Sequence, residues 1–185
     1  MTREQAHEIL CGHVQSESLR NHCRAVEASM RRYAELGGHD VEAWGVVGLL
    51  HDFDYELYPV APDHTRKGAE ILRERGLDEE SIGAILSHAT WNQDEYPLNN
   101  PLRKTLFAVD ELSGFITAVA LVRPDRLEGM KPKSVKKKLK TASFAAAVSR
   151  DDIRQGAELL ELSLDEHIAN CIEALQNRAE VLGLA

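Results

Sequence analysis

The chain has 185 residues, of which 28% are charged and 43% hydrophobic, and its formal net charge is −8. This length and composition indicate one soluble globular domain, and the negative charge argues against nucleic acid as a general partner. The longest apolar runs, near 44–50 and 115–122, are far shorter than the roughly 20 residues that span a bilayer, so no membrane partner is expected. Three cysteines are too few and too uneven for a disulfide framework, which favours a cytoplasmic location.

Helical patterns run through nearly the whole chain. Residues 17–36 place apolar side chains three and four positions apart, and Gly37-Gly38 ends that helix. Ser163 predicts an N-cap, with Glu166 completing a capping box. No segment alternates as a strand would, so the predicted fold class is all-α, one domain with a core at about 18–123 and a C-terminal helical extension at about 124–185. Helices are expected at the N-terminus and at 17–36, 41–51, 64–75, 79–91, 101–122, 150–161 and 164–182.

Several ionisable residues fall on the core side of these helices. His22 lies on an apolar stripe, and the pair His51-Asp52 directly follows the apolar run WGVVGLL. His88 flanks a second stripe and Asp110 interrupts a third. Any one of them is most simply a hydrogen-bonded core residue, but together they would each need a separate partner. One divalent metal ion would compensate all of them. The remaining histidines, His7, His13, His39 and His167, are expected at the surface or in helix caps.

Read in chain order, these residues resemble the signature of the HD phosphohydrolase superfamily: a histidine, an adjacent His-Asp pair, then a distant aspartate. The matching segments are RNHCRAVE with His22, LLHDFDYE with His51-Asp52 and LFAVDELSGF with Asp110, and the likeness covers about residues 18–120. HDIG-type members are similar in two further segments, HTRKGAEIL with His64 and IGAILSHA with His88. The chain differs from them at Phe53-Asp54, where they carry Ile-Gly, and it lacks the double histidine and GYP stretch of the cyclic-dinucleotide phosphodiesterases.

The resemblance implies an HD-type bundle of antiparallel helices and a metal-dependent phosphohydrolase acting on a small phosphorylated metabolite or nucleotide. The cofactor would be one or two divalent ions of Mn, Fe, Zn or Mg. Two alternatives stay open: a single-metal enzyme similar to a 5′-nucleotidase, and a non-catalytic module that senses a nucleotide. A diesterase or an oxygenase is also compatible with the superfamily. The implied ligands are His22, His51, Asp52 and Asp110 for one ion, with Asp52 bridging to a second ion held by His64 and His88.

Catalytic and substrate-binding residues are expected close to this ligand set. Besides Asp52, the carboxylates of Asp54 and Glu56 are placed two and four residues further on, where they could receive or orient the proton of a water molecule; loop solvation or capping explains them equally well. The segment KPKSVKKKLK, residues 131–140, contains six lysines and no acid. It indicates either a solvated helix face or a patch that attracts phosphate. The candidate phosphate-binding residues are Arg66, Lys67, Lys136 and Lys140, and Arg123 is a comparable candidate.

Overall fold

The computed structural model describes all residues, Met1–Ala185, as α-helices, one short 3₁₀ helix and connecting turns, with no strand. This confirms the all-α prediction. The helices are α1 (Arg3–His13), α2 (Glu17–Gly37), α3 (Val41–Leu50), α4 (Asp63–Glu74), α5 (Glu79–His88), the 3₁₀ helix η1 (Thr90–Asn92), α6 (Pro101–Leu121), α7 (Pro132–Leu139), α8 (Arg150–Leu159) and α9 (Leu164–Gln176).

The starts of α3, α5 and α9 are fixed by side-chain caps, as the sequence predicts. The Asp40 and Asp78 carboxylates accept hydrogen bonds from the third residue of α3 and α5, and Ser163 and Glu166 form the predicted capping box of α9. Two helix ends differ from prediction by three residues or more. Helix α5 stops at His88 rather than near residue 91, since the Asn92 side-chain amide donates to a carbonyl of its last turn. Helix α9 stops at Gln176 rather than at 182, and the turns that follow it bury Leu182 and Leu184.

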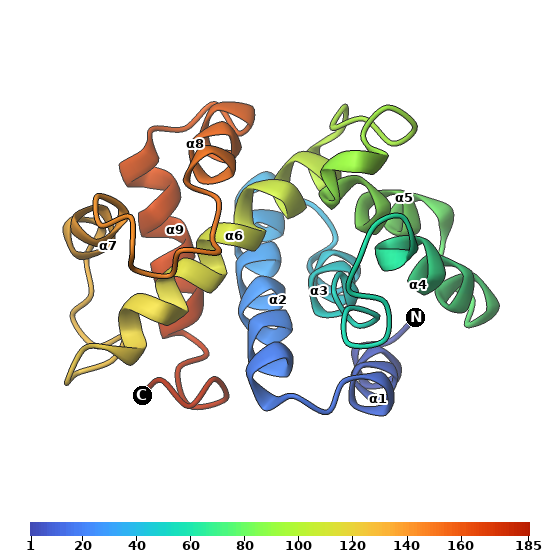
Figure 1. The fold of residues 1–185 in the computed structure, drawn as a ribbon, viewed down its shortest axis with the longest axis horizontal. Coiled ribbons are helices and arrows are strands. Elements are labelled where there is room, and N and C mark those ends of the chain that lie inside the picture. The colour runs from blue at the N-terminus through green and yellow to red at the C-terminus, as the bar shows by residue number, and fades with distance from the viewer.

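Helices α2 and α6 lie between the two ends of the molecule (Figure 1). Figure 1 shows α1, α3, α4 and α5 to one side of them and the C-terminal helices α7, α8 and α9 to the other. One continuous hydrophobic core joins both sides, since it includes Leu50 of α3, Leu112 of α6 and Ile168 of α9. No helix is both long enough and apolar enough to cross a membrane.

Two contacts fix the C-terminal helices against the rest of the fold. Helix α8 approaches α6 closely at Gly156, where an added Cβ would lie 2.6 Å from the Cα of Ala108. His167 of α9 is fully buried, with its Nδ1 2.6 Å from the Tyr33 hydroxyl and its Nε2 3.0 Å from the carbonyl oxygen of Ala108. The expectation that His167 lies at the surface is therefore wrong. Burial lowers the pKa of this imidazole to about 4, so the ring is neutral at pH 7.

Candidate metal centre

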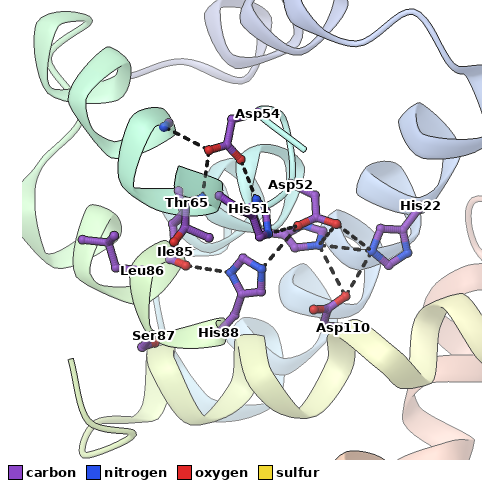
Figure 2. Close-up of polar contacts among 12 residues, drawn as sticks. His22, His51, Asp52, Asp54, Thr65, Ile85, Leu86, Ser87, His88 and Asp110 are labelled. Carbon is purple, nitrogen blue, oxygen red and sulfur yellow. Dashed lines mark hydrogen bonds and ion pairs between the residues drawn. The ribbon is translucent and has the colours of Figure 1, made fainter. Parts of the chain in front are cut away.

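The six predicted metal ligands come from five helices and one turn, and the fold brings all of them together. His22 lies on α2, His51 caps the C-terminus of α3, and Asp52 follows in the next turn. His64 precedes the regular part of α4, whereas His88 is the last residue of α5 and Asp110 lies mid-way along α6. Figure 2 shows the side chains of His22, His51, Asp52, His88 and Asp110 pointing toward one another, and His64 lines the same pocket as His22, Asp52, His88 and Asp110.

Four of the side chains form one compact donor set. The Nε2 atom of His22 lies 3.1 Å from Nε2 of His51 and 3.0 Å from Oδ1 of Asp110. The distance from His51 Nε2 to the same Asp110 oxygen is 3.4 Å, and Oδ2 of Asp52 lies 3.7 Å from His51 Nε2 and 3.8 Å from His22 Nε2. Two atoms that each lie about 2.1 Å from one ion, at angles of about 90–109°, are about 3.0–3.4 Å apart. The set therefore has nearly the spacing of ligands around a single cation.

A second donor set is built on the other oxygen of the same aspartate. The Oδ1 atom of Asp52 lies 3.3 Å from Nε2 of His64 and 3.3 Å from Nε2 of His88. These three donor atoms lie within 4.8 Å of one another, as do those of His22, His51 and Asp52. Asp52 thus faces both groups at once, one through each carboxylate oxygen.

Three of the imidazole rings are held so that Nε2 points into the pocket. The Nδ1 of His51 donates to the carbonyl oxygen of Gly48 at 2.8 Å, and the Nδ1 of His88 donates to that of Ile85 at 2.6 Å. The Nδ1 of His64 lies 3.0 Å from Oδ1 of Asp54. A hydrogen bond at Nδ1 leaves the lone pair at Nε2, which is how histidines are oriented at metal sites in proteins. Nitrogen and carboxylate donors in this arrangement fit Mn, Fe or Zn.

The family comparison agrees with this geometry. A model of the HD domain family matches residues 19–143, more than half of the chain. The chain belongs to the HD domain family. No curated protein and no solved structure matches the chain. The family match includes all six side chains of the two donor sets and continues through α7.

Asp54 does not line the pocket of the HD domain. Its carboxylate instead holds His64 of the second donor set in position. Its side chain is fully buried, and its Oδ2 accepts hydrogen bonds from the backbone N–H groups of Thr65 at 2.9 Å and Gly68 at 3.0 Å. Thr65 has a φ of 67°, a conformation that costs a β-branched residue about 1–3 kcal/mol. The bond to Asp54 and a second bond, from the Asn92 side-chain amide to the Thr65 hydroxyl at 2.8 Å, hold this turn and with it His64.

The aspartates of the donor sets stay ionised. Burial alone would raise the pKa of Asp110, but the charge of His51 and the hydrogen bond from His22 outweigh it and hold that pKa far below its usual range. Burial likewise lowers the pKa of His51 and His64, yet the neighbouring aspartates outweigh it and raise both to about 9. Without a metal the imidazoles of His51 and His64 therefore carry positive charge that balances the carboxylates. A bound cation would take over this role.

The pocket that contains the HD domain's donor atoms has a volume of about 330 Å³ and no lysine or arginine in its lining. Besides the predicted ligands, its lining includes five polar or aromatic residues, Tyr55, Thr90, Trp91, Glu111 and Asp152, of which Glu111 and Asp152 are acids that the sequence analysis did not assign to the site. Glu111 follows Asp110 on α6, and Asp152 comes from α8 in the C-terminal extension. The exposed rings of Tyr55 and Trp91 also line it. Glu111 could have been predicted at the site because it directly follows Asp110 in the sequence. No local pattern in residues 150–161 predicts that Asp152 lies at the pocket.

Several predicted site residues lie elsewhere. Both carboxylate oxygens of Glu56 accept hydrogen bonds from the backbone N–H groups of Gln15 and Ser16, each at 2.7 Å, so Glu56 ties the start of α2 and does not face the metal ligands. Neither Asp54 nor Glu56 lines the pocket, which leaves Asp52 as the one predicted catalytic carboxylate there.

The predicted phosphate-binding residues also lie outside the pocket lining. Arg66 donates to Asn92 and Glu95, each at 2.9 Å, and Lys67 pairs with Glu70 on its own helix. Lys136 forms an ion pair with Asp165 at 2.6 Å, and Lys140 is exposed at the end of α7.

Proposed function

We propose that this HD domain is a two-metal phosphohydrolase that acts on a small phosphorylated metabolite or nucleotide. The observation that carries the proposal is the position of Asp52, with one oxygen directed at His22 and His51 and the other at His64 and His88. A carboxylate placed in this way suits the bridging ligand of two ions. The likeness of the His64 and His88 segments to HDIG-type members supports the same assignment.

The pocket lining supports a phosphorylated substrate bound by ions. Divalent ions here would supply a water molecule of lowered pKa and polarise a phosphoryl oxygen. Because no lysine or arginine lines the pocket, the chain itself offers only neutral or negative groups to an anionic substrate. The protein's part is to fix the donor atoms through Gly48, Ile85 and Asp54, and to place Tyr55 and Trp91 where a base or another flat group would stack.

Proton transfer is assigned to Glu111. It is the lining carboxylate adjacent in sequence to Asp110, and its Oε2 accepts one hydrogen bond, from the backbone N–H of Ser149 at 3.2 Å. That bond fixes the side chain and leaves Oε1 without a protein partner. A fixed carboxylate at the edge of the donor set is suited to receive the proton of an attacking water molecule.

The test combines metal content with activity. Purified protein is supplied with Mn²⁺, Mg²⁺, Fe²⁺ or Zn²⁺ and assayed on phosphomonoesters, phosphodiesters and nucleotides, while bound metal per chain is measured by elemental analysis. Two ions per chain and turnover of one phosphate-ester class are expected. His64→Asn with His88→Asn should retain one ion and lose turnover, and His7→Asn on α1 is the control.

Each other outcome points to a named alternative. One ion per chain in the wild type, with activity unchanged in the His64 and His88 variants, indicates the single-metal enzyme. Two ions with no turnover of any phosphate ester indicate a metal-binding sensor or a different chemistry of the same family, such as oxygenation.

A further inference from the structure

A second cavity lies at the far end of α6, where it meets α7. Its volume is about 260 Å³, and its lining is basic and hydroxylic apart from one valine. None of its residues lines the pocket of the metal centre, and Val119 of this cavity lies nine residues beyond Asp110, about 14 Å further along α6. The lining residues are Val119, Arg123, Ser134, Lys137, Lys138 and Thr141.

The local charge contrasts with that of the whole chain. Residues 123–140 contain eight lysines and arginines and two acids, a local net charge of +6 in a chain whose total is −8. The rest of the chain therefore carries −14, so this segment is the place where an anion is attracted most strongly.

The cations that line the cavity are not neutralised by carboxylates. Lys136, which does not line the cavity, is paired with Asp165, but Lys137 and Lys138 form no ion pair. The ammonium group of Lys138 lies 4.6 Å from the centre of the Phe144 ring, which holds it in place beside the cavity. Two uncompensated ammonium groups therefore stand together at one cavity.

The positively charged guanidinium of Arg123 lines the cavity and is held in place by hydrogen bonds. It donates to the carbonyl oxygens of Arg126 at 2.9 Å and Glu128 at 2.8 Å and contacts the Ser134 hydroxyl at 3.4 Å. These acceptors are uncharged, so they fix the group without cancelling its charge. Together with the hydroxyl groups of Ser134 and Thr141, the cavity offers the charged and neutral donors by which proteins bind phosphate.

We propose that this cavity is an anion site, separate from the metal centre, that binds the phosphate or diphosphate group of a small molecule. Its volume is below the range of about 300–1,000 Å³ that is usual for whole ligands, so it accommodates the phosphate end while the remainder of the ligand extends into solvent. The proposal does not depend on the hydrolase assignment.

Calorimetric titration of the 185-residue chain with inorganic pyrophosphate tests the site. The protein is stripped of metal and carries His51→Asn, so that the metal centre contributes no binding. A single site per chain is expected, and Lys137→Gln with Lys138→Gln should weaken it at least tenfold. Thr141→Val should weaken it severalfold without changing any charge.

The control removes the same charge from the same segment outside the cavity. Lys131→Gln with Lys133→Gln is expected to change the affinity less than threefold, and thermal unfolding checks that every variant is folded. Equal losses in the two lysine pairs would show diffuse attraction to a basic surface and overturn the proposal. So would the absence of pyrophosphate binding at millimolar concentration, or binding only of an RNA oligonucleotide that both pairs weaken alike.

Discussion

Asp54 fixes the position of His64. Its carboxylate Oδ1 lies 3.0 Å from the imidazole Nδ1, and its Oδ2 accepts hydrogen bonds from the backbone N–H groups of Thr65 and Gly68. Asp54, which stands where HDIG-type sequences have glycine, therefore holds a histidine of the second donor set through hydrogen bonds. A buried acid with three donors around it cannot be exchanged without a change in what it supports.

Asp54→Asn is expected to weaken binding of the second ion by 10–100-fold and to destabilise the fold by about 1–3 kcal/mol. An amide can accept from His64 only by turning its NH₂ group toward the N–H groups of Thr65 and Gly68. Metal stoichiometry and urea unfolding measure the two effects. Glu56→Gln is the matched control, because Glu56 binds the turn before α2 and lies outside the pocket; it should lose stability but keep both ions. Loss of metal in the control alone would contradict this assignment.

Gly68→Ala should displace Asp54, and with it His64, because the added methyl group clashes with the Asp54 carboxylate. An added Cβ would lie 2.7 Å from Asp54 Oδ2 and 2.9 Å from Cε1 of Phe53, and both of these neighbours are fully buried. We expect destabilisation of about 1–3 kcal/mol together with loss of the second ion. In Gly12→Ala on α1 nothing lies within 4 Å of the new Cβ, so that variant should be as stable as the wild type or up to about 1 kcal/mol more stable. Thermal unfolding and elemental analysis distinguish the two variants.

Glu111→Gln tests proton transfer. The amide oxygen can still accept the hydrogen bond from Ser149, so the loop before α8 keeps its position, but the group no longer takes up a proton. Turnover should fall by about 100-fold or more while both ions are retained. Glu158→Gln, at an exposed position of α8, is the control and should leave turnover unchanged. Wild-type turnover in the Glu111 variant would assign the proton to another group.

The buried imidazole of His167 predicts a loss of stability in acid. Its pKa is lowered to about 4 by burial, against about 6.5 in the unfolded chain, so the unfolded state binds the extra proton first as pH falls. The free energy of unfolding should therefore decline between about pH 6.5 and pH 4, by up to about 3 kcal/mol from this residue. His167→Gln should have a shallower pH dependence across that window. Parallel pH profiles of the two proteins in urea unfolding would refute the assignment.

Most helices, and the core-side placement of several residues of the two donor sets, were predictable from the sequence because local patterns encode them. His22 and Asp110 fall on apolar stripes, and His51-Asp52 ends a helix that is almost wholly buried, so their position on the core side could be inferred without the structure. The same kind of pattern was present for His167, which lies four residues before the buried Cys171.

Other features depend on how distant segments pack. Glu56 stands four residues after Asp52, yet the chain turns in between and directs it to Gln15 and Ser16. The sequence shows how many residues separate Glu56 from Asp52, but not the direction in which the turn between them points the Glu56 side chain. Asp152 reaches the pocket only because α8 packs on α6, which is a contact between elements about 40 residues apart. Arg66 pairs with Glu95, 29 residues further along the chain, and Lys67 pairs with Glu70 on its own helix, which a charge count alone does not reveal.

The close approach of Gly156 to Ala108 has a consequence for how HD domains diversify. Since α8 is seated on the helix that carries Asp110 and Glu111, a segment beyond the family match forms part of the rim of the pocket. Two HD domains with the same donor residues but different segments after the family match would then have differently shaped pocket openings. Exchanging residues 144–185 between such chains is expected to transfer substrate preference while the metal-binding residues stay untouched.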